Sequence, residues 1–495
     1  MLRVAFIYLV LVLVRLYFAL APSYIHPDEH FQGPEVIVGQ FLGWPSFKTW
    51  EFTSEHPIRS IFPLWIVYGP PLVIFKLIAK GIGHSPSPTA VFYTLRTYMF
   101  LLSFVLEDWA LHELLPVKRE RVVALLLVAS SYVTWTYQVH TFSNSIETLI
   151  VLWCLVLLRR LIDNTQKTQT KHCATLAALC VLGIFNRITF PAFLLSAGLE
   201  TALLFFSKPW RLYVALFTGV LCTLVAIELD TAFYTNHRLR LRDKLRGAVF
   251  TPYNNLLYNM DPSNLAHHGL HPLWQHFTVN LIQLLGPAVP LIALSSRKDM
   301  LFRSGIGGIV LLSCFRHQEP RFLLPAVPLL LASIKLPTSK VRVFVAAWAV
   351  FNTLASIIFG IFHQGGVVPA QSWISKQANV TEAIWWKTYS PPRWLLGEEN
   401  LKIITKDLMG SSNSMEKIYS ELPCQTNDTK TLLIIPSSRE SVVRETFSNV
   451  SLKPEWHFSR HIGLDDLDFE QGVWTGLRQI IDDRGLTVLH LSRQC

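Results

Sequence analysis

Long apolar segments separated by short polar connections occupy most of the chain. A helix that spans a bilayer needs about 20 mostly apolar residues. Segments of this kind lie at 3–21, 91–112, 120–138, 144–162, 172–187, 189–206, 211–229, 275–295, 301–315, 321–335 and 341–362. We therefore predict an all-α polytopic membrane protein with roughly eleven transmembrane helices.

Two apolar segments are ambiguous. The segment 61–80 contains several prolines, which favours a re-entrant or interfacial segment; the alternative is that it spans the membrane and a shorter candidate does not. The first segment is expected to be a retained helix and not a cleaved signal peptide. Arg15 interrupts its apolar core, and the Ala-Leu-Ala that follows is a weak match to a cleavage site.

Composition agrees with a membrane protein. The chain has 495 residues, of which 51% are hydrophobic and 16% charged, and its mean hydropathy is +0.34. Soluble proteins usually carry about a quarter charged residues. The net charge of +10 is better explained by basic residues on the cytoplasmic side than by nucleic-acid binding, because the sequence has no Arg-rich low-complexity run and no zinc-finger spacing.

Basic clusters indicate the orientation, because cytoplasmic loops carry an excess of Lys and Arg. Such clusters lie at 118–121, 159–171, 208–211, 297–298 and 335–342. If they are cytoplasmic, the opposite side receives the loops 22–60, 139–143, 230–274 and 316–320 and the tail after 362. The loop 230–274 breaks the pattern, since its part 237–246 is strongly basic. Binding of an anionic headgroup and an amphipathic interfacial helix both explain this, and both stay open.

The tail 363–495 differs from the transmembrane domain, 1–362, because it is polar and has mixed charges. Its short runs 431–435 and 486–491 are β-like. We expect a small α+β lumenal domain there.

Glycosylation sequons agree with a lumenal tail. N-x-[ST] motifs begin at Asn379, Asn427 and Asn449. Cys424 and Cys495 also lie in this tail, and whether they form a bridge stays open.

Polar side chains gather in four clusters on the predicted lumenal face. The first is 26–30, which holds two carboxylates and two imidazoles directly after the first apolar segment; the others are 49–60, 254–276 and 316–322. Carboxylates accept protons from sugar hydroxyls, and Trp rings pack on the apolar face of a sugar. An Arg-His-x-Glu-x-Arg sequence suits a phosphate, although a self-paired ion network at a helix end is an alternative.

These clusters together suit sugar transfer from a lipid-phosphate donor. A hydroxyl must lose its proton as it attacks the anomeric carbon, and the departing phosphate needs electrostatic stabilisation. We expect no metal, because the histidines at 267, 268 and 271 match no common ligand spacing. We also expect no cofactor, because the sequence has no Walker-type loop and no dinucleotide-binding fingerprint.

Motifs distributed over 20–330 resemble the eukaryotic mannosyltransferases that use dolichol-phosphate mannose, which belong to the C-fold class of membrane glycosyltransferases. The matching residues are HPDEHFQ at 26–32, TWEF at 49–52, RS at 59–60, TFSNSIET at 141–148 and HQEPRF at 317–322. Within this family, TPYNNLLYN at 251–259 and NLAHHGLHP at 264–272 are most similar to the branch that adds the fourth, side-branching mannose to a glycosylphosphatidylinositol (GPI) precursor.

The resemblance implies an enzyme of the endoplasmic reticulum membrane that transfers mannose in the lumen, with inversion, to form an α-1,2 linkage. Its substrates would be dolichol-phosphate mannose and a GPI precursor glycolipid in the bilayer. The family's base, an acidic residue in the first lumenal loop, corresponds to Asp28, with Glu29 beside it. Gln318 departs from the family, whose members often carry a charged residue there.

We assign the remaining candidate residues by cluster. The donor phosphate is expected to contact Arg321, His317 and Arg316. Sugar or acceptor contacts are expected from His26, His30, Gln32, Trp50, Glu51, Asn254, Asn255, His268 and His271.

Other functions stay open. The enzyme could add the third mannose of the GPI precursor, or act on a dolichol-linked oligosaccharide. From a different class, a proton-coupled transporter could use residues 28–30 as a proton relay, but such a protein should place ionisable groups near the middle of the membrane and show repeat symmetry.

Overall fold

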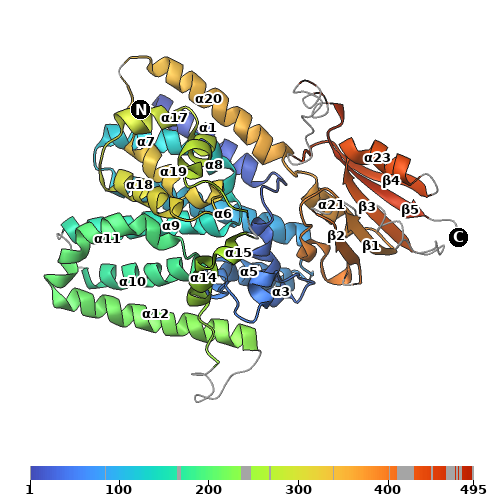
Figure 1. Cartoon of the computed structure of the whole chain (residues 1–495), viewed down its shortest axis with the longest axis horizontal. Helices are drawn as coiled ribbons and strands as arrows, with labels where there is room; N and C mark the ends of the chain where they lie inside the picture. The colour runs from blue at the N-terminus through green and yellow to red at the C-terminus, as the bar shows by residue number, and fades with distance from the viewer. Residues whose placement is uncertain are drawn as a thin grey trace. The chain divides into compact units, whose positions relative to one another are not determined.

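The computed structural model describes residues 2–83, 85–163, 169–235, 247–266, 269–337, 339–400, 402–409, 429–447, 450–463, 474, 478 and 482–492 (Figure 1). The chain divides into two compact units. Unit 1 comprises Met1–Ala19, Lys48–Pro71 and Arg96–Leu354, and unit 2 comprises Leu20–Phe47, Leu72–Leu95 and Ala355–Cys495. The first polar loop is therefore shared between the units, and its residues 20–47 belong with the tail. The predicted domain boundary after residue 362 stays a prediction.

Unit 1 is helical. Its helices are α1 (Leu2–Ala19), α4 (Trp50–Thr53), α7 (Lys118–Ala129), α8 (Tyr132–Trp135), η1 (Tyr137–Val139), α9 (Ser143–Asp163), α10 (Gln169–Asn186), α11 (Phe190–Phe206), α12 (Pro209–Thr235), α14 (Thr251–Met260), α15 (Pro262–Ala266), η2 (His276–Asn280), α16 (Leu281–Leu285), α17 (Ala288–Ser295), α18 (Met300–Ser313), η3 (Pro320–Leu323) and α19 (Ala326–Ser333). Three helices continue from one unit into the other: α5 (Phe62–Gly81), α6 (Pro88–Leu114) and α20 (Val341–Ile357), which ends in the π-helical turn η4 (Ile358–Phe362).

Each apolar segment that the sequence singled out contains helix, but fewer helices than expected are long enough to cross a membrane alone. Among the described residues five helices meet that criterion, or up to six if the pair 118–129 and 132–139, bent by 59°, is one span. The shortfall has local causes. Gly286 (φ 43°) and Pro287 separate α16 from α17, and α18 has only 14 residues. The expected number of crossings stays a prediction.

The proline-containing segment forms α5, a continuous 20-residue helix with Pro70 and Pro71 inside it. It is one of the helices that are long and apolar enough to span. This favours the alternative that 61–80 crosses the membrane.

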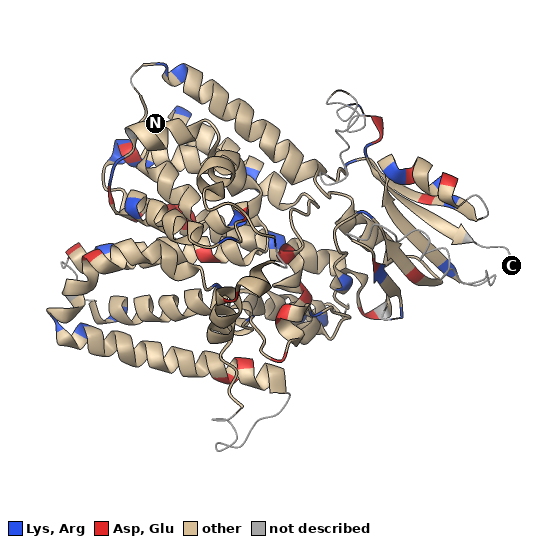
Figure 2. Ribbon diagram, in the orientation of Figure 1, with Lys and Arg blue, Asp and Glu red and all other residues tan. Residues whose placement is uncertain are grey.

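Helix packing in unit 1 follows the apolar faces. α10 packs against α9 and α12, and α11 packs against α9 and α18 (Figure 1). In α12 and α20 the charged residues lie near the helix ends, and the middle of each helix is free of them (Figure 2). A buried exception is Arg15 of α1, which donates to the Glu107 carboxylate of α6 over 2.8 Å. This pairing explains how an apolar helix tolerates Arg15.

Unit 2 contains a five-stranded mixed sheet in the order β2-β1-β3-β5-β4. Its elements are α2 (Asp28–Phe31), α3 (Pro34–Leu42), α21 (Val367–Ile374), β1 (Val380–Trp385), η5 (Arg393–Leu396), η6 (Glu398–Asn400), β2 (Ile404–Asp407), β3 (Lys430–Pro436), η7 (Ser437–Arg439), α23 (Glu440–Thr446), β4 (Ser451–Phe458) and β5 (Leu486–Ser492). β1 pairs in parallel with β2 and β3, and β5 lies antiparallel between β3 and β4. The predicted β-like runs are thus β3 and β5.

Both faces of the sheet are covered, as is typical when strands are buried on both sides. One face packs α21 together with Tyr24 of the first polar loop, and the other packs Val443 and Phe447 from α23 and its end (Figure 1). α3 also contacts η5. The segment 20–47, which carries the first polar cluster, is therefore built onto the tail.

Candidate active site

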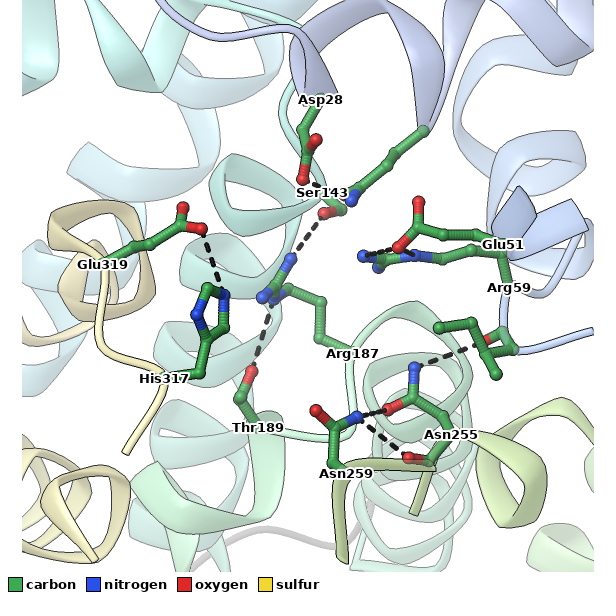
Figure 3. A network of polar contacts seen from close by, with 12 residues as sticks. Asp28, Glu51, Arg59, Ser143, Arg187, Thr189, Asn255, Asn259, His317 and Glu319 are labelled. Carbon is green, nitrogen blue, oxygen red and sulfur yellow. Dashed lines mark hydrogen bonds and ion pairs between the residues drawn. The ribbon is translucent and has the colours of Figure 1, made fainter. Parts of the chain in front are cut away.

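Asp28 begins the short helix α2, and its side chain is 21% exposed. The Gln32 side-chain amide, one turn further on, donates to its Oδ2 atom. The Asp28 N–H donates to Nδ1 of His26 over 3.2 Å, and that nitrogen lies 3.6 Å from Oδ1 (Figure 3 draws Asp28). The structure thus brings together three residues of the sequence motif 26–32.

Glu29 and His30 point away from solvent, because both side chains are almost fully buried. Glu29 accepts from the Ile25 N–H over 3.4 Å. The His30 ring lies edge-on to Tyr24, with centroids 4.9 Å apart, and near Trp394. These contacts are those of side chains that shape the loop, so among the acidic pair Asp28 is the carboxylate that reaches the surface. The catalytic assignment of Glu29 stays a prediction.

Glu35 is a fully buried acid in the same unit that the sequence reasoning did not select. Its carboxylate accepts from the Phe47 N–H over 2.8 Å. Burial raises the pKa of Glu35 to about 8, although backbone N–H groups of Phe47, Trp394 and Arg393 favour the ionised form. Its signal was weak, because a lone Glu after Gly-Pro also fits an ordinary helix start.

Two predicted clusters meet in unit 1. Glu51 and Arg59 form an ion pair at 2.8 Å (Figure 3). The side chains of Asn254 and Asn255 on α14 donate to the backbone carbonyls of residues 57 and 58, at 3.0 and 3.2 Å. The Trp50 ring lies 4.8 Å from that of Tyr258. The aromatic and acidic part of the first loop is thus held against α14.

Asp230 fixes this arrangement, and sequence reasoning missed it. Its Oδ1 atom accepts from the Ser60 hydroxyl and the Ile61 N–H, each over 2.9 Å. Its Oδ2 atom accepts from the Thr251 hydroxyl over 2.8 Å. A carboxylate near the first N–H groups of a helix satisfies donors that the helix itself cannot, so Asp230 joins the start of α5 to the start of α14.

The fourth cluster is internally paired. Glu319 lies 3.1 Å from His317 and also accepts from the Arg321 guanidinium (Figure 3 shows the His317 contact). Arg321 is nearly buried, whereas Arg316 is exposed. The self-paired network that the sequence left open is therefore present, and a donor phosphate would have to compete with Glu319 for Arg321.

The contacts of Gln318 explain why an amide, and not a charged side chain, occupies this position. Its side-chain nitrogen lies within donating distance of the carbonyls of Leu273, Ser313 and Phe315, at 3.3, 3.2 and 2.9 Å. Its oxygen accepts from the His276 N–H over 2.9 Å. The side chain joins the 273–276 segment to the end of α18.

A buried arginine adds a second cation to this region. Arg187, just after α10, donates to the Ser143 hydroxyl over 3.0 Å and to Thr189, and lies 3.3 Å from the Glu147 carboxylate (Figure 3). Its guanidinium lies 5.2 Å from the Phe322 ring, and that of Arg321 lies 5.3 Å from the same ring. The sequence pointed to 141–148 only through the family resemblance, and an Arg at the end of an apolar helix gave no further signal.

The remaining candidates divide between described and undescribed residues. His271 donates its N–H to the Arg316 carbonyl over 2.8 Å, and its ring lies 6.4 Å from that of His317, which joins the third and fourth clusters. Asn379 is exposed at a left-handed turn (φ 63°) before β1. Outside the described residues lie His268, Asn427, Asn449, Cys424, Cys495 and the whole basic stretch 237–246.

Several apolar helices long enough to cross a bilayer, with polar groups at their ends, indicate a multi-pass membrane protein. The solved structure of ArnT from Cupriavidus metallidurans, bound to undecaprenyl phosphate, matches with a TM-score of 0.56 and 12% identity, covering 98% of this chain and 97% of that chain. This likeness shows the fold.

Sequence comparison places the chain more narrowly. The chain belongs to the Alg9-like mannosyltransferase family, whose model matches residues 6–396. It is similar over nearly its full length to proteins named GPI mannosyltransferase 4. The one from Aspergillus oryzae is 47% identical, with 98% of each chain covered, and the one from Emericella nidulans is 46% identical, with 97% of each covered. The one from Saccharomyces cerevisiae is 33% identical, with 92% of this chain and 94% of that one covered.

Proposed function

We propose that this protein is an inverting α-1,2-mannosyltransferase of the endoplasmic reticulum membrane. It transfers mannose from dolichol-phosphate mannose to the third mannose of a GPI precursor and so adds the fourth, side-branching mannose. The observation that carries the proposal is the similarity to proteins named GPI mannosyltransferase 4, which covers 98% of this chain for the Aspergillus oryzae relative. Family membership also speaks against the transporter hypothesis.

The chemistry assigned to Asp28 is that of a general base. The acceptor 2-hydroxyl attacks the anomeric carbon of the donor, the bond from that carbon to the phosphate oxygen breaks, and dolichyl phosphate leaves. Asp28 takes the hydroxyl proton. Two hydrogen bonds support this role: the Gln32 amide holds the partly exposed carboxylate, and the Asp28 N–H, which donates to His26, holds the backbone at the helix start. A phosphate is a good leaving group, so neither a metal nor a protonating acid is required.

The donor phosphate is assigned to Arg321 and His317, with exposed Arg316 at the edge. Arginine suits this task because its planar fork matches phosphate oxygens. Arg187 joins this group, since both arginines lie against the Phe322 ring. When phosphate binds Arg321, Glu319 gives up that cation and keeps His317 as its partner.

The acceptor sugar is assigned to the surface where the first loop meets α14. Trp50 and Tyr258 offer an aromatic pair on which the apolar face of a mannose can pack. Glu51, Asn254 and Asn255 offer polar groups beside it. Leu256, Leu257 and Met260 are exposed on the same helix, which suits contact with lipid chains of a glycolipid acceptor.

The test is a transfer assay with microsomes that contain the full chain, labelled dolichyl-phosphate mannose and GPI precursors bearing two, three or four mannoses. We expect label only in the product formed from the three-mannose precursor, in a linkage that an α-1,2-mannosidase cleaves. Transfer to the two-mannose precursor would instead identify a third-mannose enzyme. Transfer to dolichol-linked oligosaccharide alone would overturn the acceptor assignment.

A further inference from the structure

Tyr389, in the loop after β1, is held by the segment that follows the last apolar helix. Its hydroxyl lies 3.2 Å from Nε2 of His363, and the two rings pack edge to face with centroids 5.3 Å apart. Its N–H donates to the side chain of Gln364 over 3.2 Å. Both the hydroxyl and the backbone of Tyr389 are therefore fixed by consecutive residues.

The backbone around this contact adopts conformations that side chains disfavour. Gln364 has φ 49°, and Lys387, two residues before Tyr389, has φ 58°. Non-glycine residues seldom occupy this region, and they persist there only where the surrounding structure requires it. The hydrogen bond from the Gln364 N–H to the Ile462 carbonyl, at 3.0 Å, fixes one of them. The chain is thus bent at two points beside Tyr389.

Tyr389 also lies near the residue that binds the backbone of the candidate base. The Tyr389 ring lies 6.3 Å from the His26 ring, inclined at 60°. The Nδ1 atom of His26 accepts a hydrogen bond from the Asp28 N–H. Tyr24, two residues before His26, also packs edge-on to Tyr389 at 5.6 Å and donates to the Ser390 carbonyl over 3.0 Å.

We propose that Tyr389 and His363 are positioning residues for the transfer reaction. They hold the His26 ring, and His26, by accepting from the Asp28 N–H, holds the backbone that carries the Asp28 carboxylate. This inference rests on the proposed function and deepens it, because it assigns two residues of the C-terminal tail to the positioning of the candidate base.

His363 is suited to a fixed, uncharged link. It is buried, and burial lowers the pKa of His363 to about 4, although the nearby Ile25 backbone favours its protonated form. The ring therefore stays neutral in the lumen. Depending on the tautomer, Nε2 accepts a hydrogen bond from the Tyr389 hydroxyl or donates one to it. The link needs no change of charge during the reaction.

The test compares the transfer kinetics of the full chain with those of Tyr389→Phe, Tyr389→Leu and the matched control Ser372→Ala. Ser372 shares a 2.8 Å hydrogen bond with Thr89 in the same unit, so the control also removes one side-chain hydroxyl. A misplaced catalytic group costs up to about 100-fold in rate. We expect kcat to fall about 10-fold for Tyr389→Phe and further for Tyr389→Leu, with the KM of donor and acceptor unchanged and Ser372→Ala active.

A double-mutant cycle separates positioning from simple destabilisation. If Tyr389 acts through His26, adding Tyr389→Phe to His26→Gln lowers kcat no further. Three outcomes would overturn the inference. The double variant could lose kcat by the product of the two single losses, Ser372→Ala could lose as much kcat as Tyr389→Phe, or both Tyr389 variants could keep kcat within about twofold of the parent. If His26→Gln is too slow to measure, the comparison of Tyr389→Phe, Tyr389→Leu and Ser372→Ala decides whether the inference holds.

Asp28→Asn separates this inference from the proposed function. An inactive Asp28→Asn variant together with fully active Tyr389 variants would overturn the positioning role alone. Full turnover by Asp28→Asn would overturn the base assignment on which it rests.

Discussion

The Arg187 guanidinium lies 3.3 Å from the Glu147 carboxylate, and both side chains are buried. Removing two charges from water costs free energy that their attraction only partly returns, so a buried pair is weak evidence of a stability role. The position of Arg187 beside the Phe322 ring, which Arg321 also contacts, points instead to a role in binding an anion.

The first prediction separates stability from activity at this pair. Glu147→Ala leaves Arg187 as an uncompensated buried charge, and we expect it to lower the free energy of unfolding by about 3 kcal/mol. The double variant Glu147→Met with Arg187→Met should recover most of that stability, because apolar residues replace both charges. It should still lose transfer activity. Thermal denaturation in detergent and the transfer assay measure the two quantities, and an active double variant would remove Arg187 from the donor site.

The second prediction concerns Arg321. Arg321→Ala removes a phosphate contact, so the KM for dolichol-phosphate mannose should rise about 10- to 100-fold, as expected for the loss of a charged hydrogen bond worth about 1.5–3 kcal/mol. The KM for the GPI precursor should change little. Arg303→Ala is the matched control, because Arg303 pairs with Glu200 at a half-exposed site. An unchanged donor KM would contradict the phosphate assignment.

The third prediction concerns Asp28. Asp28→Asn keeps the shape of the side chain but cannot accept a proton, so kcat should fall about 100-fold or more while the protein still folds. Asp163→Asn is the control, because Asp163 is a half-exposed partner of Arg159 in α9. Size-exclusion profiles show folding and labelled product shows turnover. Retained turnover would move the base to another residue.

The fourth prediction concerns Gln318. A glutamate there would present a carboxylate oxygen to the three carbonyls that the amide nitrogen of Gln318 now faces. A neutral hydrogen bond contributes about 1 kcal/mol. Gln318→Ala should therefore lower the thermal midpoint, and Gln318→Glu should lower it further. Gln377→Glu, which loses one bond to the Trp373 carbonyl, is the control. A stable Gln318→Glu variant would show that the amide donors are dispensable.

Hydrophobic patterning predicted where helices and two strands occur, because burial in lipid or in a core imposes a local period on the sequence. The runs at 431–435 and 486–491 became β3 and β5, which pair in antiparallel register from Thr431 to Pro436. Patterning did not predict that residues 20–47 share a unit with the tail. Contacts such as that between Tyr24 and Ser390, 366 positions apart, leave no local signal.

The sequence likewise indicated only those parts of the candidate site whose residues lie close together in the chain. Asp28 and Gln32 stand one helical turn apart, so a short motif reveals their contact. Arg187 and Asp230 are single polar residues at the ends of apolar helices. Their partners Ser143 and Ser60 lie 44 and 170 positions away, and only the packing of helices brings these residues together.

Buried titratable groups in unit 2 predict how stability depends on pH. Burial lowers the pKa of His363 to about 4 and that of His461 to about 3. In the unfolded chain these histidines take up protons near pH 6.5, so between about pH 4 and 6.5 the unfolded state binds more protons and stability rises with pH. Above about pH 7 they no longer contribute to the slope.

Glu35 gives the opposite slope in a higher range. Its pKa is about 8 in the folded protein and 4.5 when unperturbed, so between these values the folded state holds the proton that the unfolded state has lost. Stability must then fall as pH rises, and the loss ends above about pH 8. We expect the thermal midpoint in detergent to fall between about pH 7 and 8 for the parent protein and to change less for Glu35→Gln, which keeps the shape without the charge. Equal slopes in both proteins would show that Glu35 keeps an ordinary pKa, with its carboxylate ionised against the Phe47 N–H.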